Sequence, residues 1–129
     1  MIEERERKYR SVLETSPVGI IRLDVHGQNI YVNRQAEITL GIQRSDAEGR
    51  IYSDPAWQVT DLEGRPLPEE NIPFCIVQKT GKAVFGVQHG VHRADGSKVL
   101  LSANAMPLFD DNGDFNGVVA ICPQRKGRR

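Results

Sequence analysis

The sequence predicts a single α+β domain, in which five antiparallel strands form one sheet and helices pack on one face. Three observations carry this prediction. The chain has 129 residues, about the size of one domain. Apolar residues make up 39% of it and charged residues 26%, as in globular proteins, which excludes a wholly disordered chain. Short alternating segments are separated by Asp-Gly and Asn-Gly pairs, which favour hairpins.

Residues 1–16 predict an amphipathic helix that flanks the domain as a dimerisation or linker element. This segment is highly charged, contains no Gly or Pro, and is followed by Pro17, which ends a helix at the residue before it. Because the apolar stripe is thin, the helix needs a partner, either the domain body or a second copy of itself. The stripe consists of Ile2, Tyr9, Val12 and Leu13.

The next segments predict a hairpin followed by a short helix. Residues 18–23 and 28–32 are rich in β-branched side chains, and the turn between them contains Gly27. Asn33 is typical of an N-cap for a helix over residues 34–40.

Residues 43–68 have weak periodicity, and within them residues 57–59 predict a short strand. A second helix follows, with Asn71 as its expected cap, Pro73 in its first turn and Gly81 as its exit.

Three further strands are expected over residues 84–93, 99–108 and 115–122. Their connections are too short for parallel crossovers, so they must form an antiparallel meander. Residues 17–123 are therefore the expected domain core, and residues 124–129 a basic tail. That tail is either solvated, or a cut point before another domain, or a contact for nucleic acid or lipid. The whole chain is neutral, with 17 basic and 17 acidic residues, so no overall attraction to nucleic acid is expected.

Several segments resemble the PAS/PAC (S-box) family of sensory domains, in the family's order and over roughly residues 7–123. They are the opening helix and first strand at 9–20, the first hairpin at 23–33, the end of the later helix at 78–82, the late hairpin at 93–97 and 105–110, and the last turn and strand at 112–119.

The resemblance implies a five-stranded antiparallel sheet that cups a small cavity beneath the helices. It also implies a role in signal transduction, in assemblies such as the sensor histidine kinases of two-component systems, cyclic-dinucleotide enzymes or transcription regulators. One position departs from the family pattern. Gln124 stands where an aspartate of the closing junction is expected, and Pro123 is expected to disrupt continuation of the strand.

Strand alternation places every second residue beneath the helices, where it either fills a packed core or lines a pocket for a small, largely apolar ligand. Both interpretations remain open from the sequence. The expected inward residues are Ile21, Leu23, Phe85, Val87, His89, Val91, Leu101, Ala103, Ala105, Val118, Ala120 and Cys122, and the intervening segments add Trp57, Phe74 and Val77.

His89 is the polar member of this inward set, and we expect it to be either a satisfied buried side chain or a ligand contact. The cofactor stays unknown. The cysteine motif of the flavin-binding branch is missing, and residues 69–80 contain no histidine to hold haem, so neither is expected by its usual route. No zinc site is expected from Cys75 and Cys122, which are far apart in sequence, and redox sensing by Cys122 is disfavoured by burial.

No motif of a hydrolase, metalloprotease or phosphate-binding loop occurs, so we do not expect an enzyme. Three functions remain: a ligand sensor that signals through dimer or helix rearrangement, a ligand-free dimerisation or protein-interaction module, and the input domain of a transcription regulator.

We expect a homodimer, formed by the first helix beside the outward sheet face around Leu100, Ser102 and Asn104. If the chain is a fragment, a kinase or DNA-binding region would follow as the output domain. Direct nucleic-acid binding and a membrane span are not expected, and a cytoplasmic location is the default.

Overall fold

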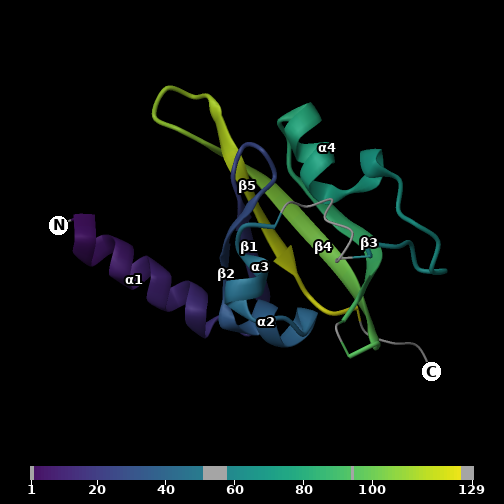
Figure 1. Ribbon diagram of the computed structural model, residues 1–129. Coiled ribbons are helices and arrows are strands. Elements are labelled where there is room, and N and C mark those ends of the chain that lie inside the picture. Colours follow the sequence, from purple (N-terminus) through teal and green to yellow (C-terminus); the bar gives the residue numbers. More distant parts are fainter. Residues whose placement is uncertain (1, 51–57, 94, 126–129) are drawn as a thin grey trace.

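The computed structural model describes residues 2–50, 58–93 and 95–125, and its elements follow the order expected from the sequence (Figure 1). In chain order these are α1 (Ile2–Thr15), β1 (Gly19–Leu23), β2 (Asn29–Val32), α2 (Arg34–Leu40), α3 (Arg44–Ala47), η2 (Glu69–Asn71), α4 (Pro73–Thr80), β3 (Val84–His92), β4 (Lys98–Phe109) and β5 (Phe115–Cys122).

The five strands form one sheet in the order β2-β1-β5-β4-β3, and every neighbouring pair is antiparallel. The two ends of the chain meet at its centre, where β1 pairs with β5 from Gly19–Cys122 to Leu23–Val118. The early hairpin and the late meander therefore share one surface. This confirms the predicted α+β architecture with a flanking N-terminal helix.

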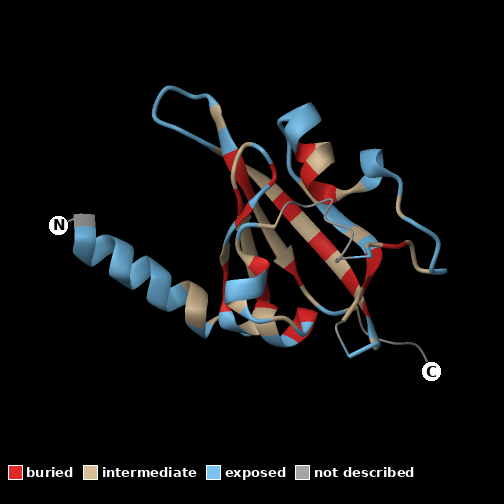
Figure 2. Ribbon diagram, in the orientation of Figure 1, coloured by how far each residue is buried: buried red, intermediate tan, exposed pale blue. Residues whose placement is uncertain are grey.

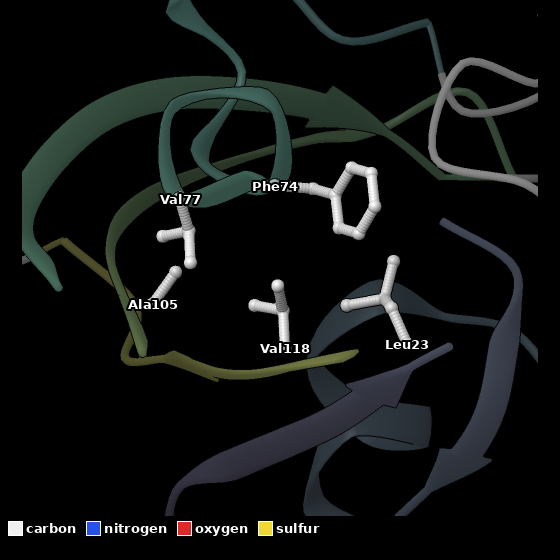
Figure 3. Packing of buried hydrophobic residues seen from close by; sticks show 5 residues of the cluster. All are labelled: Leu23, Phe74, Val77, Ala105 and Val118. Carbon is white, nitrogen blue, oxygen red and sulfur yellow. The ribbon is translucent and has the colours of Figure 1, made fainter. Parts of the chain in front are cut away.

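Helix α4 covers one end of the inner face of the sheet. Its residues Phe74 and Val77 pack against Leu23, Ala105 and Val118 from three different strands (Figure 3). All five side chains are almost completely buried. Burial of apolar surface is worth about 25 cal/mol per Å², so this cluster is a main contribution to the stability of the fold.

Helix α2 covers the other end of the same face. Leu40 packs there with Val91, Val99 and Leu101, which come from β3 and β4, and with Cys122 of β5. The clusters under α4 and α2 are bridged by Ile21 and Ala120, which pack against both of them. In contrast, residues 3–12 of α1 are exposed, and this part of the helix projects away from the sheet (Figures 1 and 2).

Asn33 joins α1, β1 and α2 through a side chain that is fully buried. Its Oδ1 accepts hydrogen bonds from the backbone amides of Ala36 and Ile20, both at 2.9 Å. Its Nδ2 donates to the carbonyl oxygens of Leu13 at 2.8 Å and Val18 at 3.1 Å. The predicted N-cap is confirmed, but the same amide also holds the end of α1 against the start of β1, which no local sequence signal indicates.

The second predicted cap is wrong. Asn71 lies in the turn of 3₁₀ helix η2, and α4 begins after Ile72 without a side-chain cap. Pro73 does occupy the first turn of α4, and Gly81 ends the helix in the left-handed conformation, both as expected. The weak periodicity of residues 43–68 also concealed α3. Residues 51–57 lie outside the described part of the chain, so the strand expected at 57–59 stays a prediction.

Strand β3 does not keep the simple alternation that the sequence predicts. Its register slips between Val84 and Val87, where Gly86 takes a φ of 67°, a conformation that side chains disfavour. The bulge turns Phe85 outward and leaves 69% of it exposed. The inward orientation predicted for Phe85 is therefore wrong, and Val84 packs against the core in its place.

The end of β5 also differs from the expectation. Pairing with β4 continues beyond Pro123, because the ladder there uses the proline's carbonyl oxygen, which accepts from Ser102 N–H at 3.1 Å. The next bond runs from Arg125 N–H to Leu100 O at 2.7 Å. Strand β5 nevertheless ends at Cys122, and the pairing beyond it is one isolated bridge between Leu101 and Gln124, so Pro123 ends the strand but not its pairing with β4. Among the described helices, none is both long and apolar enough to cross a membrane.

Replacing Asn33 by alanine should lower the free energy of unfolding by about 2–4 kcal/mol, because it removes a helix cap and leaves buried backbone groups without partners. Urea unfolding followed by circular dichroism measures this change. Asn112→Ala is the matched control, since Asn112 lies exposed in the last turn, and it should change stability by less than about 0.5 kcal/mol. Equal effects of the two substitutions would contradict the role assigned to Asn33.

Candidate functional site

A cavity of about 110 Å³ lies on the inner face of the sheet, between the clusters under α2 and α4. Its lining is mostly apolar and comes from all five strands, from α2 and α4, and from the loops. The described residues that line it are Ile21, Leu23, Asn29, Leu40, Val59, Ile72, Pro73, Phe74, His89, Val91, Leu101, Ala103, Ala120 and Cys122.

The strand alternation correctly placed most of the predicted inward residues around this cavity. Val77, Ala105 and Val118 are also inward, but they fill the neighbouring core beneath α4 (Figure 3). Val87 is half-buried opposite Ala103 and does not line the cavity, and Trp57 lies outside the described residues. Those of the predicted set that line it are Ile21, Leu23, Phe74, His89, Val91, Leu101, Ala103, Ala120 and Cys122. The inner face therefore holds both a packed core and a cavity.

Sequence reasoning missed five lining residues: Asn29, Leu40, Val59, Ile72 and Pro73. Leu40 belongs to the helix predicted over residues 34–40 and could have been found by helical spacing. Asn29 could not have been found from the sequence, because the irregular pairing of β1 with β2 near Leu23 turns this residue toward the interior. Its Nδ2 donates to Arg50 O at 2.8 Å, which holds the loop after α3 against β2.

His89 is a titratable side chain that lines the cavity, and only 7% of its surface is exposed. Its Nδ1 lies 3.3 Å from the carbonyl oxygen of Val87. A carbonyl can only accept, so Nδ1 carries the proton and Nε2 of the neutral ring carries a lone pair. Burial lowers the pKa of His89, and the Val87 hydrogen bond opposes this only in part. The ring is therefore a neutral hydrogen-bond acceptor.

Cys122 lines the cavity as an unreactive thiol. Complete burial raises its pKa to about 12, so almost no thiolate forms at neutral pH. Cys75 packs at the edge of the core beneath α4. No group of three or more metal-binding side chains occurs among the residues that the structure describes.

A second polar arrangement holds the last turn of α1 against the domain. Glu14 accepts two hydrogen bonds from Nη2 of Arg44, at 2.8 and 2.9 Å, and one from the hydroxyl group of Tyr31. Partial burial would raise the pKa of Glu14, but these hydrogen bonds outweigh it and the pKa is lowered. The carboxylate is thus ionised, and it fixes α1 to β2 and to the start of α3.

The residues predicted for the dimer helix lie on α1 in different environments. Tyr9 and Val12 are 60% and 66% exposed, whereas Leu13 is half-buried. The side chain of Ile2 lies outside the described part of the structure. Tyr9 and Leu13 line a cleft of about 140 Å³ together with Arg22, Ile30 and Tyr31 of the first hairpin.

Comparison with known families decides the classification of this fold. The family model of the PAS fold matches residues 7–123, nearly the whole chain. The chain belongs to the PAS fold family. The cavity therefore lies where PAS domains, by the resemblance described above, are expected to have one, under the helices and on the inner face of the sheet. Comparison with curated proteins gives no match.

Solved structures of PAS domains share the fold at low sequence identity. The PAS domain of an HTR-like protein from Haloarcula marismortui is 20% identical, with a TM-score of 0.72, and the match covers 96% of this chain and 94% of that one. A PAS domain from a two-component sensor histidine kinase is 12% identical, with a TM-score of 0.73, and coverage of 97% and 100%. The Vibrio cholerae VqmA dimer, described as a LuxR-type receptor, is 19% identical, with a TM-score of 0.68, and coverage of 93% and 51%.

The pKa of His89 makes the stability of this PAS domain depend on pH. Because burial lowers the pKa of the folded state, the unfolded chain takes up a proton first as the pH falls below the ordinary value of 6.5. The contribution of neutral His89 to the free energy of unfolding is then fully present above that pH. It is lost below that pH, by at most about 1.4 kcal/mol per pH unit. Urea unfolding at pH 7.5 and 5.5 should show a larger loss in the wild type than in His89→Gln. An equal loss in both proteins would mean that His89 is not protected from protonation.

Proposed function

We propose that this PAS domain is a sensory module that binds a small, largely apolar ligand carrying one hydrogen-bond donor. The observation that supports this proposal is the cavity on the inner face of the sheet, where His89 offers an acceptor among apolar side chains. Small-molecule sites commonly combine an apolar lining with a few well-placed polar groups. A domain of this family serves sensor kinases and regulators, which fits such a role.

The size of the cavity limits the class of ligand. Sites for drug-sized molecules measure roughly 300–1,000 Å³, and an apolar cavity of about 150 Å³ accommodates benzene. At about 110 Å³, this cavity suits a molecule of a few heavy atoms. Flavin and haem are much larger than such a molecule, so neither is the proposed cofactor.

The signal would leave the cavity through the strands that line it. Asn33 links β1 to the end of α1 and the start of α2, and Leu40 of α2 lines the cavity. A ligand changes the position of α1 only if it binds two arrangements of these elements with different affinity. The proposed output is therefore a rearrangement of α1, or of the extended segment after β5, that acts on a downstream kinase or DNA-binding region.

The proposal includes no catalytic step for this domain. It also places the domain in a reducing compartment such as the cytoplasm, which is supported by the free thiol of Cys122.

Pyrrole and furan test the proposed site, since both are five-membered rings and only pyrrole carries an N–H donor. Pyrrole should bind about fivefold more tightly than furan, because one neutral hydrogen bond to His89 is worth about 1 kcal/mol. Titrations followed by amide NMR spectra should show the largest shifts at His89, Leu101 and Ala103.

Substitution of one wall residue provides the control. Ala103→Leu should abolish binding of both probes, because the larger side chain fills the cavity from β4. Ser102→Leu introduces the same side chain at the preceding residue, which faces away from the cavity. It should leave the affinities for both probes unchanged. Unaltered probe binding in Ala103→Leu would refute the proposed site.

We propose homodimerisation as a second function, because the outer sheet face carries half-buried apolar side chains and α1 carries exposed ones. Two cross-strand pairs of apolar residues lie on the outer sheet face, Ile20 with Ile121 and Met106 with Val119. This face continues through the cleft beside α1 to Tyr9 and Val12. An exposed helix of this length is marginal in water without a partner, and a second copy would cover both surfaces. VqmA is described as a dimer, which is consistent with this interpretation.

The double substitution Tyr9→Glu/Val12→Glu should raise the dimer dissociation constant at least about tenfold, because it places charge in an apolar interface. Sedimentation velocity over a concentration series measures this constant. Phe85→Glu/Phe109→Glu makes the matched change at two exposed apolar residues on β3 and β4, and should leave the constant unchanged. A monomeric wild type, or equal effects of the two double substitutions, would exclude an α1 interface.

A further inference from the structure

A groove of about 370 Å³ separates α1 from β2 and α3, on the outside of the domain and apart from the cavity. One face of α1 lines it with Arg7, Arg10, Ser11 and Glu14. These residues are spaced three, four and seven apart, so their side chains project from the same side of the helix. Ile30, Tyr31, Arg44 and Glu48 line the opposite wall.

The groove contains three guanidinium groups and two carboxylates, and the carboxylates already have partners. Glu14 accepts hydrogen bonds from Arg44 and Tyr31, and Glu48 accepts one from the backbone amide of Val32 at 3.3 Å. Arg7 and Arg10 form no ion pair within the described residues. The groove therefore has a positive balance and several free N–H donors.

A separate observation indicates that these donors lack an acceptor. Two buried side-chain polar atoms in the described part of the chain have no hydrogen-bond partner, and both are arginine nitrogens, Nε of Arg44 and Nε of Arg22. Arg44 lines the groove, and Arg22 lines the smaller cleft on the other side of α1. Arg10, Ile30 and Tyr31 border both spaces. Buried charged donors without an acceptor are unusual in folded proteins, and both occur beside this helix.

We propose that the groove between α1 and β2 binds an oxyanion, that is, a phosphate or carboxylate group. Arg7 and Arg10 supply donors from α1, and Arg44 supplies guanidinium N–H groups from the opposite wall. The Nε of Arg44 is buried, so it reaches the anion only when this side chain turns toward the groove. Guanidinium groups bind such anions with charge-assisted hydrogen bonds, often in pairs. Glu48 opposes the anion from the same wall, which limits the affinity.

The position of the groove gives the anion a consequence for α1. Arg44 connects the groove to the contact with Glu14 that holds α1 against β2. An anion beside Arg44 competes with Glu14 for its donors, while it attracts Arg7 and Arg10 toward the domain. The bound anion therefore changes the angle or mobility of α1 from a site that shares no lining residue with the cavity.

Inorganic phosphate and malonate are the probes for this site, each compared with chloride at the same ionic strength. Amide NMR titration of the intact chain should show saturable shifts at Ser11, Glu14, Tyr31 and Arg44 for the oxyanions only. The difference between the two probes shows whether a phosphate or a carboxylate group is preferred, and saturable binding of either supports the site.

Two double variants of α1 separate a site from general charge attraction. Arg7→Gln/Arg10→Gln should weaken binding about tenfold, because it removes both groove-lining guanidinium groups. Arg5→Gln/Lys8→Gln removes the same charge from exposed positions on the same helix that do not line the groove, and should change binding less than twofold. Glu48→Gln should increase the affinity for the oxyanion, because it removes the carboxylate that opposes the anion. Shifts that do not saturate, or equal losses in the two double variants, would overturn the proposal.

Discussion

The fold depends on the pairing of β1 with β5, because this contact joins the two halves of the chain. Without it, a two-stranded hairpin and a three-stranded meander would each expose one apolar face, and isolated hairpins are marginal in water. The pairing also brings Leu23 beside Val118 and Ile21 beside Ala120. Gly117 permits the approach, since a Cβ atom there would lie 2.4 Å from the carbonyl oxygen of Leu23. The cavity is thus a consequence of long-range pairing, which is formed only when both ends of the chain are in place.

Local sequence signals predicted the strands, the flanking helix and the cap at Asn33, because turn chemistry and residue alternation act over a few positions. They failed where a neighbouring segment decides the outcome. Phe85 points outward because a bulge at Gly86 breaks the alternation of β3. Asn29 reaches the cavity because the β1–β2 register is irregular. The ladder beyond Pro123 depends on which backbone groups β4 presents. Periodicity within one segment contains no information on any of these.

The two faces of the sheet carry different features. The inner face holds the cavity and His89, whereas α1 carries exposed apolar side chains, and the Nε atoms of Arg22 and Arg44 beside it have no hydrogen-bond partner. Asn33 and Glu14 connect the two sides, since one ties α1 to β1 and the other ties it to β2 and α3. A change on either face would thereby reach α1, in which residues 3–12 are exposed.

Native mass spectrometry of freshly purified protein tests the proposed sensor most directly. The account predicts a species heavier than the 14.4 kDa polypeptide by the mass of one small molecule per chain, and loss of that added mass in Ala103→Leu. Recovery of the bare polypeptide mass in every species of the wild-type protein, together with failure of pyrrole to bind, would contradict it.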